Sequence, residues 1–494
     1  MKADVVVVGA GIVGSTIARE LSKYEVDVAV VEKEADVAFG SPTKANTGVI
    51  HPGFDDPPGT VRAEHCSRGN ALWHDIAREV AAPFEEVGSL VVALEDEEVE
   101  VLEELKRRGH ANGVPDLEIV DDDDRLHRME PHLNMGAVSA LLAPTAAITS
   151  PYELAIAMME NAVRNGVRIY FETEVTGITV RQGRVTGIQT TRGEIEAQFV
   201  INAAGLWADR ISGMVGLSQF MIHPRKGEYY ILDKKAGDLV RHVIFPTPSP
   251  ISKGIVVTPT VEGNTLIGPN AQDIDDREDM TTTHSGLAEV WAGACKLIPS
   301  IADKKNMIIT NFCGLRPEPD TKDFIVGGSQ TVRGFINAAG MRSPGLTAAP
   351  SVALRVVDIL VKSGVELKRK LAFDPRRKPI DKPVKRSDLS FAQSLISQDP
   401  DYGHVVCRCE HVTKGEILEA IRRGATTLDG VKFRTRAGMG RCQGGFCGPH
   451  LLKLMSEELA IPAQDITKRG RGSRVLLGRA KELLRGGDSN GRDD

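Results

Sequence analysis

The stretch MKADVVVVGAGIVGSTIARELSKYEVDVAVVEKE, residues 1–34, decides the fold of the N-terminal part of the chain. An apolar, β-branched run of strand length leads into a turn with Gly9, Gly11 and Gly14, continues with helical spacing, and returns to a second strand. In such a βαβ unit Gly9 makes the tight turn, Gly11 lets backbone approach a pyrophosphate, and Gly14 allows close helix–strand packing. Glu32 ends the second strand, where it can bind a ribose 2′-hydroxyl. The stretch therefore predicts a dinucleotide site.

Four cysteines lie close together near the other end of the chain. Cys407 and Cys409 occur in Cys-Arg-Cys-Glu, and Cys442 and Cys447 in Gly-Arg-Cys-Gln-Gly-Gly-Phe-Cys-Gly-Pro. A Cys₄ donor set suits either tetrahedral zinc or a [2Fe-2S] cluster, and thiolate ligands alone do not choose between them. Thiols with a purely structural role are the third interpretation.

The residues around these cysteines favour the iron–sulfur cluster. Basic side chains suit a centre with residual negative charge, and glycines expose backbone N–H groups that can donate to sulfur. The basic residues are Arg408, Lys432, Arg434, Arg436 and Arg441, and the glycines are Gly438, Gly440, Gly444, Gly445 and Gly448. The run VCRCEHVTKGEI…TLDGVKFRTRAGMGRCQGGFCGPH also resembles the bacterioferritin-associated-ferredoxin type of [2Fe-2S] domain. We therefore predict that Cys407, Cys409, Cys442 and Cys447 bind one [2Fe-2S] cluster.

The glycine fingerprint does not by itself separate FAD from NAD. No second fingerprint follows it in the sequence. A single nucleotide site, in a chain that also carries an iron–sulfur motif, fits a resident flavin better than a diffusing nicotinamide. The cofactors that we expect are thus FAD and a [2Fe-2S] cluster.

Composition and charge set limits on the class of protein. The 494 residues are 41% hydrophobic and 26% charged, which is ordinary for a globular protein of several domains. Apolar runs are too short to span a bilayer, and the N-terminus lacks the features of a signal peptide, so we expect a cytoplasmic protein. Three further cysteines, Cys66, Cys295 and Cys313, do not suggest a disulfide framework and are expected to be small core residues.

Charge is distributed unevenly along the chain. Residues 401–494 hold 17 Lys and Arg against 12 Asp and Glu, a net of +5, so with a chain total of -6 the preceding residues carry -11. Because the basic residues crowd around the cysteines and in a Gly-rich tail, we expect them to neutralise the cluster and dock a partner, with no nucleic acid bound.

The order of patterns predicts an α/β fold with interleaved domains. Two later segments with helix, strand and glycine-turn patterns are expected to belong to the nucleotide domain again. A β-branched region with Gly and Pro turns predicts a mainly antiparallel sheet. A charged, Pro-rich run predicts a linker. The acidic run 121–124 is expected to be a solvated loop or a helix start, and residues 474–486 to form a short amphipathic helix. The predicted parts are a Rossmann-like FAD-binding domain (1–85, 151–215 and 331–366), a substrate domain (86–150 and 216–330), a linker (367–400), a [2Fe-2S] domain (401–466) and a basic tail (467–494).

Several further motifs carry a resemblance to a known family. TKANTGVIHPGFDDPPGT, RKGEYYILDK, TPTVEGNTLIGPNAQD, GLRPEPDTKDFIVG and NAAGMRSPGLTAAP, together with the fingerprint, resemble the FAD-dependent glycerol-3-phosphate dehydrogenase and L-2-hydroxyglutarate dehydrogenase group of the D-amino-acid-oxidase-like superfamily. With the cluster domain, the arrangement resembles the anaerobic-type large subunit. The resemblance covers the chain to about residue 466. It implies non-covalent FAD held, beyond the fingerprint and Glu32, by Lys33, Thr43, Asn46, Thr47, Gly48, Val175, Ala204, Gly205, Gly340, Gly345, Leu346 and Thr347.

The resemblance also implies the residues of a substrate pocket. His51, in the Gly-rich loop that the family places at the isoalloxazine, is our candidate for the base that takes the hydroxyl proton. Arg316 and Arg342 would clamp a carboxylate or phosphate, the alternative for each being a structural ion pair. Lys226 and Tyr229 align with the group's substrate-facing strand and would supply another cation and a hydroxyl donor.

The identity of the substrate depends on its anionic group. Glycerol-3-phosphate enzymes typically carry an Arg shortly after the glycines of this loop, whereas here Phe54 and Asp55 offer no cation. Phosphate recognition must then come from elsewhere in the chain or be absent. We expect oxidation of a small anionic hydroxy compound, above all sn-glycerol 3-phosphate to dihydroxyacetone phosphate.

Three alternatives to this function stay open at this point. They are a dehydrogenase for L-2-hydroxyglutarate or a related 2-hydroxy acid, an amine dehydrogenase subunit of the sarcosine or proline type, and a non-catalytic electron-transfer subunit. Electrons would leave through the cluster to a protein or quinone acceptor. The expected partner is an additional flavoprotein or iron–sulfur subunit, through which the chain would associate peripherally with a membrane.

Overall fold

The computed structural model describes all residues except 41, 249–253, 385–387, 479 and 484–494. The chain forms two compact units. Unit 1 consists of Met1–Lys33 and Val37–Pro379, and unit 2 of Glu34–Asp36 and Ile380–Asp494. Within the described ranges, no helix has the length and apolar character needed to cross a membrane.

The N-terminal fingerprint forms the centre of a six-stranded sheet in the described part of unit 1. Strand β1 (Val5–Val8) pairs in parallel with β2 (Val28–Val31) on one side and β13 (Phe199–Asn202) on the other. The sheet continues with β9 (Arg168–Tyr170) beside β2, and with β21 (Phe335–Ala339) and antiparallel β20 (Ile325–Gly328) beyond β13. The segments 1–85, 151–215 and 331–366 thus supply strands to one sheet, and β20 joins it from the range expected to belong to the substrate domain.

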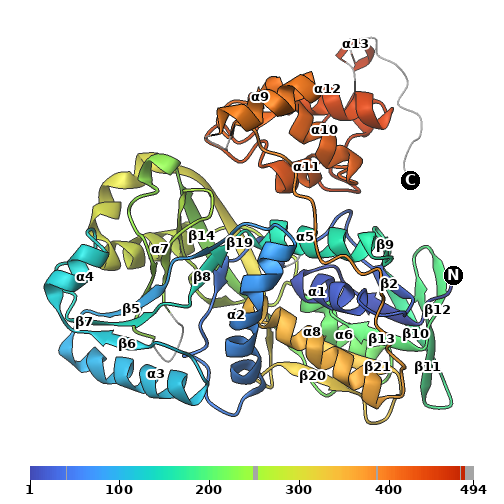
Figure 1. Ribbon diagram of the computed structural model, residues 1–494, viewed down its shortest axis with the longest axis horizontal. Helices are drawn as coiled ribbons and strands as arrows, with labels where there is room; N and C mark the ends of the chain where they lie inside the picture. The colour runs from blue at the N-terminus through green and yellow to red at the C-terminus, as the bar shows by residue number, and fades with distance from the viewer. Residues whose placement is uncertain (41, 249–253, 385–387, 479, 484–494) are drawn as a thin grey trace. The chain divides into compact units, whose positions relative to one another are not determined.

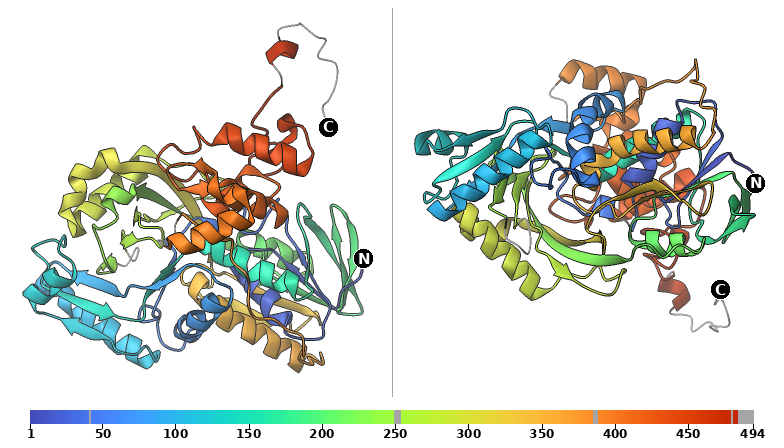
Figure 2. Two further views of the ribbon diagram at one scale, coloured as in Figure 1. Left: turned by 45° about the horizontal axis from the view of Figure 1, so that its top comes forward. Right: turned by 90° about the horizontal axis from the view of Figure 1, so that it is seen from below.

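Both faces of this sheet are covered. On one face helix α1 (Ile12–Leu21) packs against α5 (Pro151–Arg164) and α8 (Gly345–Lys362), and α2 (Val61–Glu79) packs on α8. Alternate residues of β1, Val6 and Val8, point to the other face, because side chains alternate along a strand. There they share a core with the meander β10 (Val175–Arg181), β11 (Arg184–Thr190) and β12 (Gly193–Glu196), which lies beside the N-terminus in Figure 2.

Unit 1 also contains a second, mainly antiparallel sheet of nine described strands, as the β-branched pattern predicted. Its long pair is β14 (Ile222–Leu232) with β19 (Ile308–Pro319). The other strands are β18 (Gln272–Asp273), β17 (Thr265–Ile267), β16 (Val257–Pro259), β15 (Val243–Pro246), β5 (Ser89–Ala93), β7 (Ser139–Ala143) and β6 (Glu118–Val120). Only β15 and β5 pair in parallel among them.

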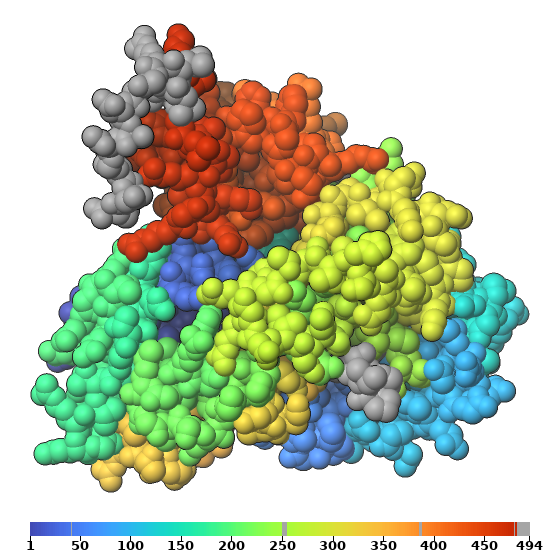
Figure 3. Space-filling view, turned by 180° about the vertical axis from the view of Figure 1, so that it is seen from behind, coloured from blue at the N-terminus to red at the C-terminus, as the bar shows by residue number. Residues whose placement is uncertain are grey.

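Alternation along β5 again separates two cores. Leu90 and Val92 pack with α7 (His284–Leu297), whereas Val91 and Ala93 pack with α3 (Val99–Ala111). Figure 1 shows the two helices on opposite sides of this sheet. In the space-filling view of Figure 3, the yellow surface of α7 meets the cyan surface of the segment around β6 and α4 (Asp123–Met129).

Unit 2 is a small helical unit around the cysteines. Its elements are α9 (Leu389–Gln398), β22 (Val405–Cys407), β23 (Val412–Thr413), α10 (Lys414–Arg422), α11 (Leu428–Thr435) and α12 (Gly448–Leu459). Helix α10 begins with a capping box, in which the Thr413 side chain accepts from the Glu416 backbone N–H and the Glu416 carboxylate accepts from Thr413. Cys407 and Cys447 are part of the apolar core of this unit.

Local details complete the comparison with the sequence. The acidic run starts a helix, since the Asp122 side chain accepts from Arg125 N and caps α4. The range expected to be a linker contains helix α9, capped by Asp388.

Cys66 and Cys313 are buried core residues, and burial raises the pKa of the Cys313 thiol to about 11. Of the expected tail helix 474–486, the structure shows the short α13 (Ala480–Leu483), and the expectation for residue 479 and residues 484–486 lies outside the described residues.

Candidate active site and cysteine centre

A cavity of about 1400 Å³ lies inside unit 1, between the parallel sheet and the β14–β19 pair. Its lining comes from the carboxyl ends of β1, β2 and β13 on one side and from β14 and β19 on the other. In open α/β sheets ligands bind outside the carboxyl ends of the parallel strands. The cavity is therefore placed where a dinucleotide and a substrate would meet.

The glycine turn at one end of the cavity leaves no room for side chains. Gly9 has φ +101°, and a Cβ there would lie 2.6 Å from the Ala203 carbonyl oxygen. At Gly14 a Cβ would lie 1.9 Å from the Gly9 oxygen. Gly9 and Gly11 line the cavity, and Gly11 forms the N-cap of α1 without a side-chain cap. The N-terminus of α1 can therefore face an anion.

Glu32 lies beside this turn. Its side chain lines the cavity, the residue is only 7% exposed, and its Oε2 accepts a hydrogen bond of 2.6 Å from Ala10 N. Lys33 follows it, with its Nζ 4.5 Å from the ring centroid of Trp207, which also lines the cavity. Trp207 was not predicted from the sequence, because nothing in its local pattern marks it as a cavity residue.

The other residues expected to hold the cofactor fall into two groups. Those lining the cavity are Thr43, Asn46, Thr47, Val175, Ala204, Gly205, Gly345 and Leu346. Gly14, Gly48, Gly340 and Thr347 do not line it and instead support the lining segments. Thr347 Oγ1, for example, accepts a hydrogen bond of 2.9 Å from His51 N.

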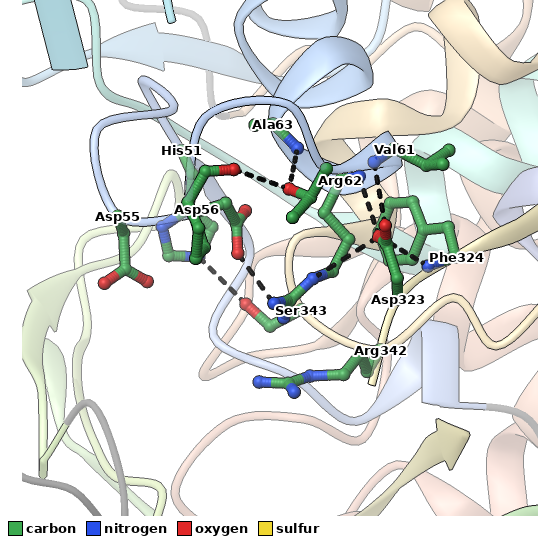
Figure 4. Close-up of polar contacts among 12 residues, drawn as sticks. His51, Asp55, Asp56, Val61, Arg62, Ala63, Asp323, Phe324, Arg342 and Ser343 are labelled. Carbon is green, nitrogen blue, oxygen red and sulfur yellow. Dashed lines mark hydrogen bonds and ion pairs between the residues drawn. The ribbon is translucent and has the colours of Figure 1, made fainter. Parts of the chain in front are cut away.

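His51 follows strand β3 (Val49–Ile50) and lines the same cavity. Besides the Thr347 contact, its backbone is held by Asn70, whose Nδ2 donates to the His51 oxygen at 3.2 Å. The ring Nε2 lies 3.4 Å from Ser343 Oγ, as Figure 4 shows, and the ring centroid is 5.9 Å from that of Phe245. A histidine with a fixed backbone and a hydroxyl partner in a cavity can act as a proton acceptor.

Arg316 extends from β19 toward the cavity. Its Nε donates to the Arg225 oxygen at 3.3 Å, and its Nη2 donates to the Lys226 and Asn270 oxygens at 3.0 and 2.7 Å. Burial lowers the pKa of Arg316, but an arginine stays charged at any ordinary pH. Because neutral carbonyls hold it, its charge is not cancelled by a carboxylate hydrogen bond.

Arg342 is a second guanidinium at this end of the cavity, and it carries a partner. Its Nη1 lies 2.7 Å from Glu318 Oε1, and both residues line the cavity. The structural ion pair that the sequence left open is therefore present. It does not remove Arg342 from the cavity.

Strand β14 corrects one expectation from the sequence. Lys226 does not line the cavity. It is buried on the other face, where its Nζ lies 2.6 Å from Asp279 Oδ2 and donates to the Thr281 oxygen. Because side chains alternate along a strand, its neighbour Arg225 points into the cavity with Tyr229. Burial raises the pKa of Tyr229 to about 12, so its hydroxyl stays a donor.

Arg62, in the first turn of α2, was missed by the sequence reasoning. It lines the cavity, and its guanidinium lies 3.4 Å from Asp56 Oδ1 and 3.7 Å from Asp323 Oδ1. Figure 4 shows it between these two carboxylates. Asp323 also caps the helix by accepting from the Val61 and Arg62 backbone N–H groups. Asp323 is 261 residues away from Arg62 in sequence, so no local signal could have joined them.

The four cysteines of unit 2 form a connected chain of thiols. Cys407 and Cys409 have their Sγ atoms 3.9 Å apart, and so do Cys409 and Cys442. A hydrogen bond from Cys447, with backbone donors at Gly438 and Glu410, lowers the pKa of Cys407 to about 5, which favours its thiolate. Across the described residues, no three or more His, Cys, Asp or Glu side chains converge on a point for one metal ion. In a [2Fe-2S] cluster each of the two irons takes two thiolates, and thiols spread out in a chain such as this one are compatible with that arrangement.

The basic residues around the cysteines separate into two groups. Arg434 and Arg436 are buried, and Arg436 Nε lies 2.9 Å from Glu410 Oε2. Lys432 has its pKa lowered by burial. Arg408 and Arg441, in contrast, are exposed. The expectation that all five cations neutralise the cluster is wrong for Arg434 and Arg436, because their charges are paired with the buried carboxylates of Asp36 and Glu410.

Comparison with known proteins adds two family matches. Residues 4–359 match the FAD dependent oxidoreductase family, and residues 405–457 match the BFD-like [2Fe-2S] binding domain. A glycerol 3-phosphate dehydrogenase of Caloramator mitchellensis is 44% identical over 97% of this chain and 99% of that protein. The anaerobic glycerol-3-phosphate dehydrogenase subunit A1 of Haloferax volcanii is 27% identical over 94% of this chain and 84% of that protein.

A solved structure supports the same fold. Dithionite-reduced L-alpha-glycerophosphate oxidase from Mycoplasma pneumoniae, with FAD bound, has a TM-score of 0.72 and 29% identity over 77% of this chain and 99% of that chain. The cavity of unit 1 fits FAD, because its glycine turn leaves space for a pyrophosphate and Glu32 lines the cavity beside that turn, where it can bind a ribose. The chain therefore belongs to the FAD dependent oxidoreductase family, and a BFD-like [2Fe-2S] binding domain follows the FAD-binding part.

Proposed function

We propose that this protein oxidises sn-glycerol 3-phosphate to dihydroxyacetone phosphate and passes the electrons through its [2Fe-2S] centre to a separate acceptor. The observation that carries the proposal is the combination, in one cavity, of His51 with the guanidinium groups of Arg225, Arg316 and Arg342. A secondary alcohol needs a proton acceptor, and a phosphate dianion needs cations. The 44% identical relative is named for the same substrate.

We propose that three arginines of the cavity supply the cations that the loop after His51 lacks. Phe54 is buried in the apolar core beside α3, and Asp55 lines the cavity as an acid, so this loop supplies no cation for a phosphate. Arg225, Arg316 and Arg342 approach the cavity from β14, β19 and the segment before α8 instead. We propose that phosphate oxygens bind to these groups, with Arg316 as the best-anchored of them.

The side chains of the cavity would do the following work. His51 would accept the hydroxyl proton of the substrate as the C2–H hydride leaves, with Ser343 orienting its ring. Tyr229 would stay protonated and donate to a substrate oxygen. FAD, held by the glycine turn and Glu32, supplies the hydride-accepting chemistry when bound. The products are the ketone, reduced flavin and a protonated His51.

Arg316→Ala is expected to raise KM for glycerol 3-phosphate by roughly 10- to 100-fold, because charge-assisted hydrogen bonds to phosphate are lost. Because the interaction is made in the bound substrate as well as in the transition state, kcat should fall much less. Steady-state kinetics with a dye acceptor measures both constants. Arg316→Lys should recover part of the affinity, and Arg192→Ala, an exposed arginine paired with Glu172, should change neither constant.

The same assay tests the choice of substrate. A phosphate site should reduce the flavin with glycerol 3-phosphate and be inhibited by inorganic phosphate. Preference for L-2-hydroxyglutarate without phosphate inhibition would assign a dicarboxylate substrate, and flavin bleaching by N-methyl amino acids would assign an amine. A flavin that no small substrate reduces would contradict catalysis by this chain.

Glu32→Ala is expected to weaken FAD binding by roughly 1–3 kcal/mol, because a buried carboxylate that can bind the ribose is removed. The Ala10 N–H would also lose its 2.6 Å acceptor. Flavin content after dialysis and flavin fluorescence titration measure the loss, while iron content should be unchanged. Glu194→Ala, an exposed acid on β12, is the control. Full flavin retention by the Glu32 variant would show that Glu32 is not the ribose ligand.

A further inference from the structure

Backbone carbonyls from two segments hold Arg316 in the cavity. Its Nε donates to the Arg225 oxygen of β14, and its Nη2 donates to the Lys226 oxygen of β14 and to the Asn270 oxygen. A guanidinium has five N–H donors, so these contacts use the one on Nε and both on Nη2. Within the residues that the structure describes, the hydrogen bonds of Arg316 do not include Nη1. The two Nη1 donors therefore remain for a ligand of the cavity that Arg316 lines.

Gly227 provides the space that this arrangement needs. It is a buried residue of β14, one position after Lys226. A Cβ at Gly227 would lie 3.0 Å from Arg316 Nη2 and 2.7 Å from Pro269 Cβ. Because packed side chains do not tolerate contacts this short, either the guanidinium or the Pro269 segment would have to move. The guanidinium can lie against the backbone of β14 because residue 227 has no side chain.

Asn270 lies between strands β17 and β18, which both pair with β14. The printed registers join Ile267 to Tyr230 and Gln272 to Lys226, so residues 268–271 cross β14 outside these ladders. The Asn270 side chain supplies a contact there, since its Oδ1 accepts from the Glu228 backbone N–H at 2.9 Å.

A second contact anchors the other end of the Asn270 amide. Its Nδ2 donates to Glu289 Oε2 of α7 at 3.1 Å, and Asn270 is only 5% exposed. The side chain of Asn270 thus joins β14 to α7. In doing so it fixes the position of its own carbonyl, which receives Arg316 Nη2 at 2.7 Å.

We propose that Asn270 and Gly227 are positioning residues for Arg316, which direct its Nη1 group to the anionic end of the substrate. The inference deepens the proposed function and rests on it, because that function assigns the substrate anion to Arg316. With Nε and Nη2 engaged by carbonyls, Arg316 cannot grip an anion through two nitrogen atoms side by side. It binds through one nitrogen. A guanidinium that is held in advance loses little side-chain freedom on binding, so the anchor contributes to affinity.

Asn270→Ala should lower the affinity of the oxidised, FAD-loaded protein for inorganic phosphate by about tenfold, because the carbonyl that receives Arg316 loses its anchor. Isothermal titration calorimetry measures this affinity without turnover, and glutarate, a dicarboxylate, is the second probe. In steady-state kinetics KM for glycerol 3-phosphate should rise by a similar factor, while kcat should change by less than about threefold.

An exchange of two groups tests whether the side-chain hydrogen bonds are the cause. Asn270→Asp/Glu289→Gln changes neither the size of the side chains nor the net charge. The carboxylate at position 270 can then accept from the Glu228 N–H and from the amide at position 289. This variant should recover most of the affinity that Asn270→Ala loses and bind phosphate within about threefold of wild type.

The Arg316→Ala background separates positioning from a general effect on folding. If Asn270 acts through Arg316, adding Asn270→Ala to Arg316→Ala should lower phosphate affinity by less than about a further twofold. Asn270→Ala also leaves the Glu228 N–H without its acceptor, which should lower the melting temperature. That loss of stability should occur in both backgrounds.

Gly227→Ala is the second variant, and it should weaken phosphate binding about tenfold or more because its Cβ displaces the guanidinium. Its control is Gly327→Ala in β20, where a Cβ would meet nothing within 4 Å. The control for Asn270 is Asn134→Ala. Asn134 also makes two hydrogen bonds, as Nδ2 donates to the Lys296 oxygen at 2.7 Å and Oδ1 accepts from Gly136 N at 2.9 Å. Both controls should bind phosphate within about twofold of wild type.

Four outcomes would overturn the proposal. They are no binding of either anion to wild type, unchanged anion affinity in Asn270→Ala, an equal loss of affinity in the wild-type and Arg316→Ala backgrounds, and no recovery in the exchanged variant. Failure of the proposed function looks different. Wild type would then bind glutarate but not phosphate, and a tenfold loss of glutarate affinity in Asn270→Ala would still support the positioning of Arg316.

Discussion

His51→Ala should lower the rate of flavin reduction by glycerol 3-phosphate by about two to four orders of magnitude, the usual contribution of a positioned general base. The structure supports this role through the fixed position of the residue. Thr347 and Asn70 hold its backbone from two different helices, and Ser343 contacts its Nε2. Alanine removes the proton acceptor without disturbing those backbone contacts, so folding and FAD content should be preserved.

Stopped-flow spectroscopy isolates this step, because flavin absorbance reports reduction before any electron leaves the protein. Ser343→Ala is the informative companion variant. This variant removes only a 3.4 Å contact to the His51 ring, so the rate of flavin reduction should fall much less than in His51→Ala. The pH profile of that rate should shift as well. If the flavin of His51→Ala is reduced as fast as that of wild type, His51 does not take the proton.

The parts of the fold that the sequence predicted are those with local signals. The turn at Gly9 and Gly14 requires glycines for steric reasons that hold within one βαβ unit, so it could be recognised without a structure. The antiparallel character of the second sheet also followed from β-branched runs and turns. The pairing of β13 with β1 and of β21 with β13, in contrast, depends on contacts over more than a hundred residues.

At the candidate site, the local sequence does not determine which face of strand β14 lines the cavity. Lys226 and Arg225 are adjacent, and a shift of one residue exchanges the faces of a strand. The resemblance identified the strand but not which of its faces lines the cavity. The structure selects Arg225 and Tyr229, and it leaves Lys226 with Asp279.

Partners distant in sequence escaped prediction for a related reason. Arg62 lies between Asp56 and Asp323, and Arg342 lies beside Glu318. Arg62 was missed in the sequence, and for Arg342 an ion pair was one alternative but its partner could not be named, because Asp323 and Glu318 come from other segments. The same holds for Arg436 in unit 2, which seemed available to the cluster until Glu410 was found against it.

Cys442→Ala should remove the [2Fe-2S] centre and with it the transfer of electrons to any one-electron protein acceptor. Cys442 is the end of the thiol chain that begins at Cys447, and it is the most exposed of the four. An iron that loses one of its two thiolates has water as its nearest substitute, so we expect iron and labile sulfide to fall from about two of each per chain to near zero. The visible absorption of the cluster should disappear with them.

The Cys442→Ala variant should leave the flavin site of unit 1 intact. The cavity, His51 and the arginines all belong to unit 1, so glycerol 3-phosphate should still reduce the flavin at close to the wild-type rate. Reoxidation by a protein acceptor should fail, whereas a small dye that reaches the flavin directly should still turn the enzyme over. Cys295→Ala, at a half-buried cysteine of α7, is the matched control and should keep all of its iron. One equivalent of zinc without labile sulfide in the wild-type protein would contradict the cluster, and full acceptor reduction by Cys442→Ala would show that electrons leave the flavin by another route.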